Sequence, residues 1–103
     1  MSLAVHPPSR ELEAAVLAVV REIPAGLLAA PVHTWVVAFG TDWSGDEAFF
    51  VRAVLDVETI PPGAMTMMSP AVREAVDRSG VLPGAWTYLS LRTAADPGDD
   101  APG

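Results

Sequence analysis

An acidic segment, GTDWSGDE at residues 40–47, holds the densest group of side chains that could do chemistry in this sequence. Three of its side chains, Asp42, Asp46 and Glu47, carry carboxylates that are close enough along the chain to converge on one divalent cation. Carboxylate oxygens are the ligands that Mg²⁺ and Ca²⁺ prefer, and a hydrolase could use such an ion. A divalent-metal-dependent hydrolase or ion-binding domain at this loop is therefore one hypothesis.

The spacing of the same segment argues against a known calcium motif. Asp42, Ser44 and Asp46 match positions one, three and five of an EF-hand loop, but position six requires glycine and holds Glu47. Position twelve holds Ala53, where the motif has a bidentate glutamate. Because aspartate and glycine also supply turn geometry, the favoured interpretation is a solvated hairpin turn.

Missing residue types exclude several reaction classes. The sequence has no cysteine and no lysine, so thiol nucleophiles, thiolate zinc sites, Schiff bases and P-loops are ruled out. His6 and His33 are not at metal-ligand spacing, and no Gly-x-Ser-x-Gly elbow is present. We therefore expect no cofactor, and enzymatic activity is the less favoured class of function.

Composition limits the domain count and the partners. A chain of 103 residues with half of them hydrophobic is long enough for one core, and its net charge of −7 disfavours binding to nucleic acid. The apolar stretches in residues 12–20 and 23–41 are interrupted or flanked by charges and prolines, unlike a signal peptide or a membrane span. We expect a small bacterial-type cytoplasmic domain that has no membrane partner.

Local patterns predict five elements. A helix is expected over residues 10–23 with Ser9 as its N-cap, and a second helix over 70–79, with Ser69 as cap, Pro70 in the first position and Gly80 after the end. Strands are expected over 32–39, 49–57 and 85–93. Residues 1–93 would form one domain, and residues 94–103 a disordered acidic tail.

The order helix, strand, strand, helix, strand predicts an α+β two-layer sandwich. A crossover through the second helix could place the third strand beside the first, which gives a three-stranded sheet of order 2-1-3 with both helices on one face. The other face of the sheet would then be open.

Alternation along the strands predicts which side chains lie on that open face. The odd residues of 49–57 are all apolar and are expected under the helices, together with Trp35, Val37 and Phe39. Small residues of the first strand, Thr34 and Val36 among them, are expected to form a floor between the other two strands. Side chains expected on the open face are Phe50, Arg52, Val54, Trp86, Tyr88 and Arg92. A one-residue shift at Gly84 would instead bury Trp86 and Tyr88 in the core.

Aromatic residues and arginine are enriched at interface hot spots, and a contiguous apolar patch on a small domain usually marks a binding surface. The leading hypothesis is therefore a non-catalytic interaction module that forms a homo-oligomer, most simply a dimer, through its open face, with another protein as a second possible partner. A third hypothesis is an acidic antagonist that uses Asp96, Asp99 and Asp100 of the tail.

Methionines in residues 65–68 are expected to pack as gap fillers more than to form an adaptable contact surface.

Overall fold

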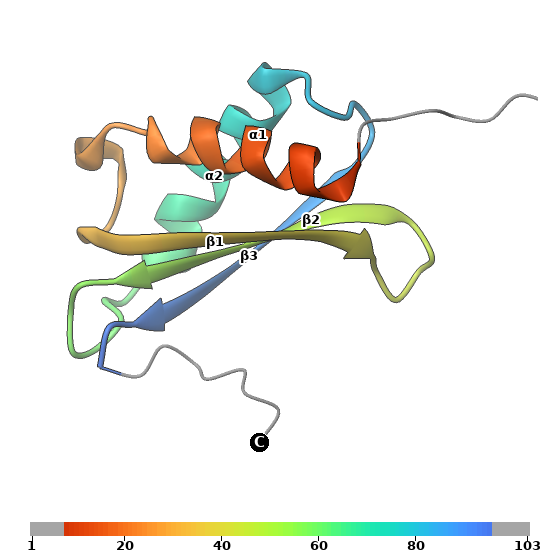
Figure 1. Cartoon of the computed structure of the whole chain (residues 1–103). Helices are drawn as coiled ribbons and strands as arrows, with labels where there is room; N and C mark the ends of the chain where they lie inside the picture. The colour runs from red at the N-terminus through yellow and green to blue at the C-terminus, as the bar shows by residue number, and fades with distance from the viewer. Residues whose placement is uncertain (1–7, 96–103) are drawn as a thin grey trace, which may run out of the picture.

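The computed structural model describes residues 8–95, in which two helices lie on one face of a three-stranded sheet (Figure 1). The elements are α1 (Ser9–Arg21), the 3₁₀ turn η1 (Ala25–Leu27), β1 (Val32–Thr41), β2 (Glu47–Leu55), α2 (Ala64–Ser79) and β3 (Trp86–Thr93). The predicted α+β sandwich with both helices on one face is confirmed. Most of the predicted tail, residues 96–103, lies outside the described residues.

The order of the strands differs from the prediction. The sheet runs β1-β2-β3, so the central strand is β2 and the predicted order 2-1-3 is wrong. β1 and β2 pair antiparallel through the hairpin, whereas β3 returns from α2 to pair parallel with β2. The physical reason lies in β2, where Ala48, Phe49, Val51 and Leu55 are all buried, because a strand this apolar is stabilised by neighbours on both edges.

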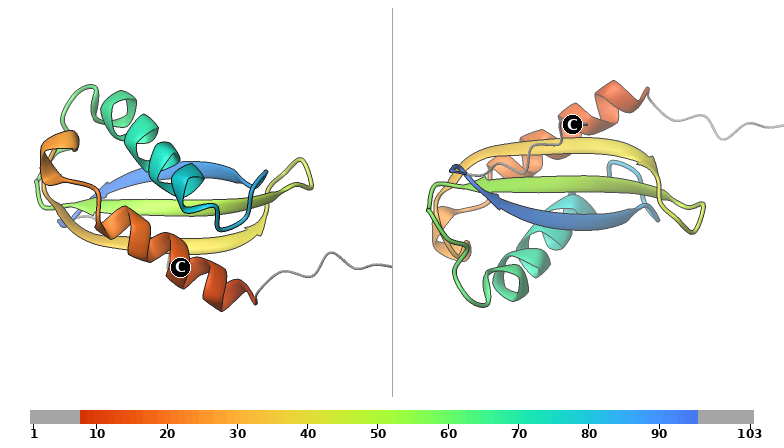
Figure 2. Two further views of the ribbon diagram at one scale, coloured as in Figure 1. Left: turned by 90° about the horizontal axis from the view of Figure 1, so that it is seen from above. Right: turned by 90° about the horizontal axis from the view of Figure 1, so that it is seen from below.

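The core fills the space between the sheet and the helices, as the strand alternation predicts. Phe49 and Val51 of β2 pack with Leu12, Val16 and Val20 of α1 and with residues of α2. Figure 2 shows α1 lying over β1 and α2 lying over β3, with the strands facing the viewer in the view from below. The predicted helix-facing residues Trp35, Val37 and Phe39 are partly buried against this core.

The first helix begins one residue earlier than predicted, with Pro8 and not Ser9 at its N-cap position. The carbonyl of Pro8 accepts the amides of Glu11 and Leu12, so the helix starts without a side-chain cap. Within the described part of the chain, neither α1 nor α2 is long and apolar enough to cross a membrane.

The second helix begins six residues before the predicted start. It starts at Ala64, after Gly63 in the left-handed region, and Pro70 lies inside it. The longer helix buries Ala64 and Met68 completely, and this apolar contact offsets the backbone hydrogen bond that Pro70 cannot donate. Gly80 ends the helix at φ 64°, as predicted. Of the methionines, Met68 packs in the core, whereas Met67 is 55% exposed.

Candidate functional site

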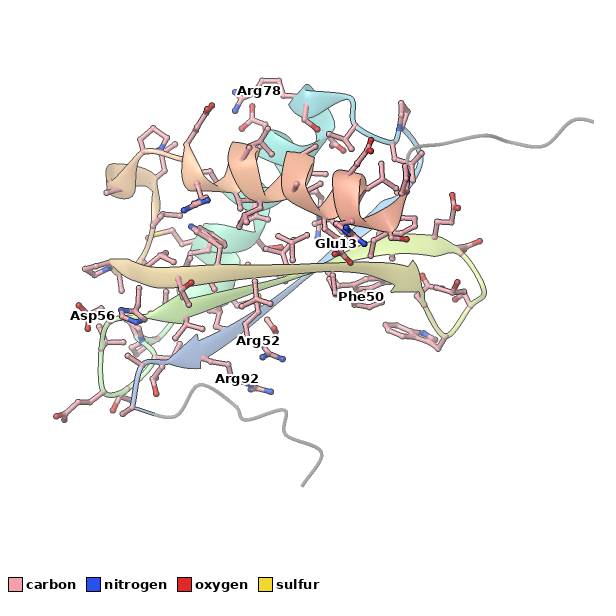
Figure 3. The ribbon with its side chains drawn as sticks, viewed as in Figure 1. Glu13, Phe50, Arg52, Asp56, Arg78 and Arg92 are labelled. Carbon is pink, nitrogen blue, oxygen red and sulfur yellow. The ribbon has the colours of Figure 1, made fainter. Side chains whose placement is uncertain are left out.

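The predicted open face exists, and its residues lie on the side of the sheet opposite the helices. Phe50 of β2 stands opposite Tyr88 of β3, and Val54 stands opposite Arg92. Figure 3 shows Phe50, Arg52 and Arg92 projecting away from the helices, with Phe50 toward the hairpin and Arg92 toward the other end of the sheet. Because β2 is central, the small residues of β1 line one edge of this face and do not form a floor between the other strands, which corrects that expectation.

Exposure differs among the residues predicted on this face. Trp86 is 54% exposed and Arg92 is exposed, whereas Phe50, Arg52 and Tyr88 are partly buried. Val54 is only 4% exposed, so its side chain is covered by neighbouring residues of the face and offers little surface to a partner. The alternative in which Trp86 and Tyr88 are ordinary core residues is wrong, because the register with β2 places both on the side of Phe50 and Trp86 is 54% exposed. Trp86 lies on the edge strand β3, where its ring also contacts Arg73 of α2.

Four aromatic side chains, Trp43, Phe50, Trp86 and Tyr88, form what we call the aromatic cluster. Tyr88 lies at its centre: its ring stacks on Phe50 with centroids 5.5 Å apart and an interplanar angle of 15°. Tilted contacts join Tyr88 to Trp43 at 5.0 Å and to Trp86 at 6.5 Å. These separations fall in the range of favourable aromatic pairs, so each exposed indole has a favourable contact with the ring of Tyr88.

The hairpin loop is held against β3 by a single carboxylate. Tyr88 Oη donates a hydrogen bond to Asp42 Oδ2 at 2.9 Å. The other oxygen, Oδ1, accepts the backbone N–H groups of Ser44 at 2.8 Å and of Asp46 at 3.0 Å. The side chain of Asp42 thus closes its own loop, which is the turn interpretation of the segment, and also positions Tyr88 beneath Trp43.

The hydrogen bonds of Asp42 shift two ionisation equilibria. Burial acts to raise the pKa of Asp42, but the hydrogen bonds from Asp46, Tyr88 and Ser44 outweigh it, so the pKa is lowered from its ordinary value of 3.8. Burial and the neighbouring Asp42 carboxylate together raise the pKa of Tyr88 above its ordinary value of 10.0. Near neutral pH the pair is therefore a charged acceptor with a neutral donor, which makes the bond a strong one.

The predicted metal ligands are not gathered around a common point. Both oxygens of Asp42 accept hydrogen bonds within the protein, while Asp46 and Glu47 are exposed. Within residues 8–95, no three histidine, aspartate or glutamate side chains are grouped as a metal site would require. The metal-dependent alternative remains a prediction that this geometry does not strengthen.

Trp43 is the part of this surface that the strand pattern could not supply. It lies in the loop, outside any strand, and its side chain is 81% exposed. The sequence signal available here is the turn chemistry of Asp42, which predicts a loop at this position but not the contact of Trp43 with Tyr88. Arg73 of α2 adds a further contact, with its guanidinium 5.9 Å from the centroid of Trp86.

Comparison of the chain with protein-family models, with curated proteins and with solved structures finds no match. Any functional conclusion therefore depends on the geometry of the chain itself.

Proposed function

We propose that this chain is a cytoplasmic, non-catalytic interaction domain that forms a homodimer through its open sheet face. The observation that carries the proposal is the aromatic cluster, in which the exposed Trp43 and Trp86 contact the central Tyr88. Large aromatic residues held in one conformation lose little entropy on binding, and this is why they dominate interface energetics.

The geometry supports a weak dimer more than a permanent one. Three strands about 4.8 Å apart, each rising about 3.3 Å per residue, give this face a flat area on the order of 400 Å². The relief of the side chains is not included in this area. Stable interfaces bury about 800 Å² on each partner. A symmetric dimer covers four exposed indoles, Trp43 and Trp86 of each copy, and at roughly 3 kcal/mol each on area alone they contribute about 12 kcal/mol, against about 4–15 kcal/mol for lost freedom of motion. We therefore expect a dissociation constant on the order of 10 µM.

Tryptophan fluorescence over a dilution series tests this function. The chain has three tryptophans, and two of them, Trp43 and Trp86, are exposed on the proposed contact face. As the protein is concentrated from about 1 µM to about 1 mM, the range that brackets the expected constant, their emission should move to shorter wavelength as water is excluded. Trp86→Phe should reduce that shift.

Trp35→Phe is the matched control, because Trp35 packs on the helix side of the sheet and should not sense association. That variant should keep the full concentration-dependent shift. An emission maximum that stays constant over the whole dilution series would contradict self-association through the aromatic cluster.

A further inference from the structure

Charge is distributed unevenly along the open face. The face residues of the strands include Arg52 and Arg92 and no carboxylate. The hairpin end carries the exposed carboxylate of Asp46 in the loop. Glu47, at the start of β2, is also exposed, but its alternation with Phe49 directs its side chain to the helix side of the sheet. The face is thus basic toward the end of β3 and acidic and aromatic where β3 begins. A surface with opposite charges at its two ends can be complementary to a second copy of itself.

The acidic end contains a cleft whose walls suit a cation. It has a volume of about 700 Å³ and is lined by Asp46, Glu47, Gly84, Trp86 and Tyr88, among others. Carboxylates beside aromatic faces attract guanidinium groups by charge and by cation–π contact. Trp86 already makes such a contact within the chain, with the guanidinium of Arg73 at 5.9 Å. The arginine that a second copy could offer here is Arg92, which is exposed at the far end of the same face.

We propose that two copies dock open face to open face about a two-fold axis that crosses the strands at the Phe50–Tyr88 pair, so that Arg92 of each copy enters the acidic cleft of the other. The inference rests on the proposed dimer and specifies its geometry. A two-fold axis perpendicular to the strands makes β3 of one copy antiparallel to β3 of the other. A residue that lies before Tyr88 on one copy then faces the residue that lies equally far after Tyr88 on the other copy. Arg92 is four residues beyond Tyr88, and β3 begins at Trp86, two residues before it. Gly84, in the wall of the cleft, lies in the turn that precedes this end of the strand.

The alternative two-fold arrangement of the same faces is disfavoured by charge. A two-fold axis parallel to the strands would bring Arg92 of one copy near Arg92 of the other, and the acidic loop of one copy near the acidic loop of the other. Like charges brought together at an interface cost association free energy, so electrostatics selects the antiparallel arrangement. In that arrangement the aromatic rings occupy the centre and the charged groups the rim, which is the usual anatomy of an interface.

A charge swap tests this arrangement by measuring the dimer dissociation constant by sedimentation equilibrium. Arg92→Glu and Asp46→Arg should each weaken the dimer about 10-fold to 100-fold, because each places like charges together at two symmetric positions. The double variant Arg92→Glu/Asp46→Arg restores opposite charges and should recover most of the affinity. The control is Arg78→Glu, an equal charge reversal on α2, which lies on the helix side of the molecule (Figure 3).

The possible results separate this inference from the function on which it rests. A wild-type dimer that is weakened by Trp86→Ala but not by Arg92→Glu would overturn the two-fold arrangement and leave the proposed function standing. Single variants that weaken the dimer without recovery in the double variant would overturn the Arg92–Asp46 pairing. A wild-type chain that remains monomeric at about 1 mM would overturn both. Thermal melting of each variant verifies that it is folded.

Discussion

Tyr88 and Asp42 are 46 residues apart in the chain, and the hydroxyl of Tyr88 donates a 2.9 Å hydrogen bond to the carboxylate of Asp42. The bond joins the hairpin loop between β1 and β2 to β3, which the same loop also contacts through the rings of Trp43 and Tyr88. It also fixes the ring on which Trp43, Phe50 and Trp86 all lie. The stability of the loop and the shape of the aromatic cluster are thereby coupled.

Tyr88→Phe keeps the aromatic ring and removes the hydroxyl. We expect the melting temperature to fall by about 4–8 °C, the change typical for loss of one hydrogen bond in a domain of this size. Asp42→Ala should lower the melting temperature further, because two loop amides also lose their acceptor. Asp42→Asn keeps an oxygen for those amides, so its melting temperature should lie between those of Tyr88→Phe and Asp42→Ala. Equal melting temperatures for wild type and Tyr88→Phe would show that the bond does not stabilise the fold.

The same pair predicts how stability depends on pH. The lowered pKa of Asp42 means that its contribution is complete above the unfolded value near 3.8 and is lost as pH falls through the folded value. The raised pKa of Tyr88 means that its contribution is complete below about 10 and is lost as pH rises through the folded value. Urea unfolding across pH should show both declines.

Two variants assign those declines to their residues. Tyr88→Phe should lack the alkaline component that comes from this phenol, and Asp42→Asn should flatten the acidic component. A profile of Asp42→Asn identical to that of the wild type below pH 4 would contradict the assignment to Asp42.

Glu13 protects the outer edge of β1. Its Oε2 accepts the backbone N–H of Phe39 at 2.8 Å, so the amide at this position points away from β2. Unpaired edge amides are sites for unwanted strand pairing. Glu13→Ala should cost about 1–2 kcal/mol in unfolding free energy and speed hydrogen exchange at the Phe39 amide, while Glu13→Gln, which keeps an acceptor oxygen, should lie nearer to wild type. Unchanged exchange in Glu13→Ala would contradict this role.

Adjacent methionines in α2 provide a matched test of the core. Met68 is fully buried and Met67 is 55% exposed. Met68→Ala should lower the unfolding free energy by about 2–5 kcal/mol, because it leaves a cavity between α2 and the sheet. Met67→Ala should change it by less than about 0.5 kcal/mol. Similar losses for the two variants in urea unfolding would contradict the difference in burial between the two side chains.

Local sequence patterns were sufficient to predict the faces of the strands. The apolar odd residues of β2 and the position of Gly80 each depend on nearest neighbours in the chain, and both predictions are confirmed. The turn at Asp42 was predictable for the same reason, because aspartate and glycine form such turns through contacts within a few residues.

The remaining features depend on distant contacts. The place of β3 beside β2 follows from the apolar side chains that β2 buries on both faces, which favour the central position in the sheet, and a handedness rule alone does not decide between its two neighbours. The early start of α2 follows from burial of Ala64 and Met68, which overrides the proline signal at residue 70. The Tyr88–Asp42 bond requires the register of β3, which no local pattern specifies.

Light scattering of the wild-type chain and of Trp86→Ala, each measured from about 1 µM to about 1 mM, tests the central claim most directly. The account predicts that the wild-type mass rises with concentration toward twice that of one chain. Trp86→Ala should remain near the mass of one chain, since a hot-spot aromatic lost from both copies weakens binding about a thousand-fold. Leu27→Ala, which truncates a side chain that is equally exposed but lies in η1, should behave as wild type. A wild-type mass that stays at one chain throughout, or a Trp86→Ala variant that dimerises as the wild type does, would contradict the account.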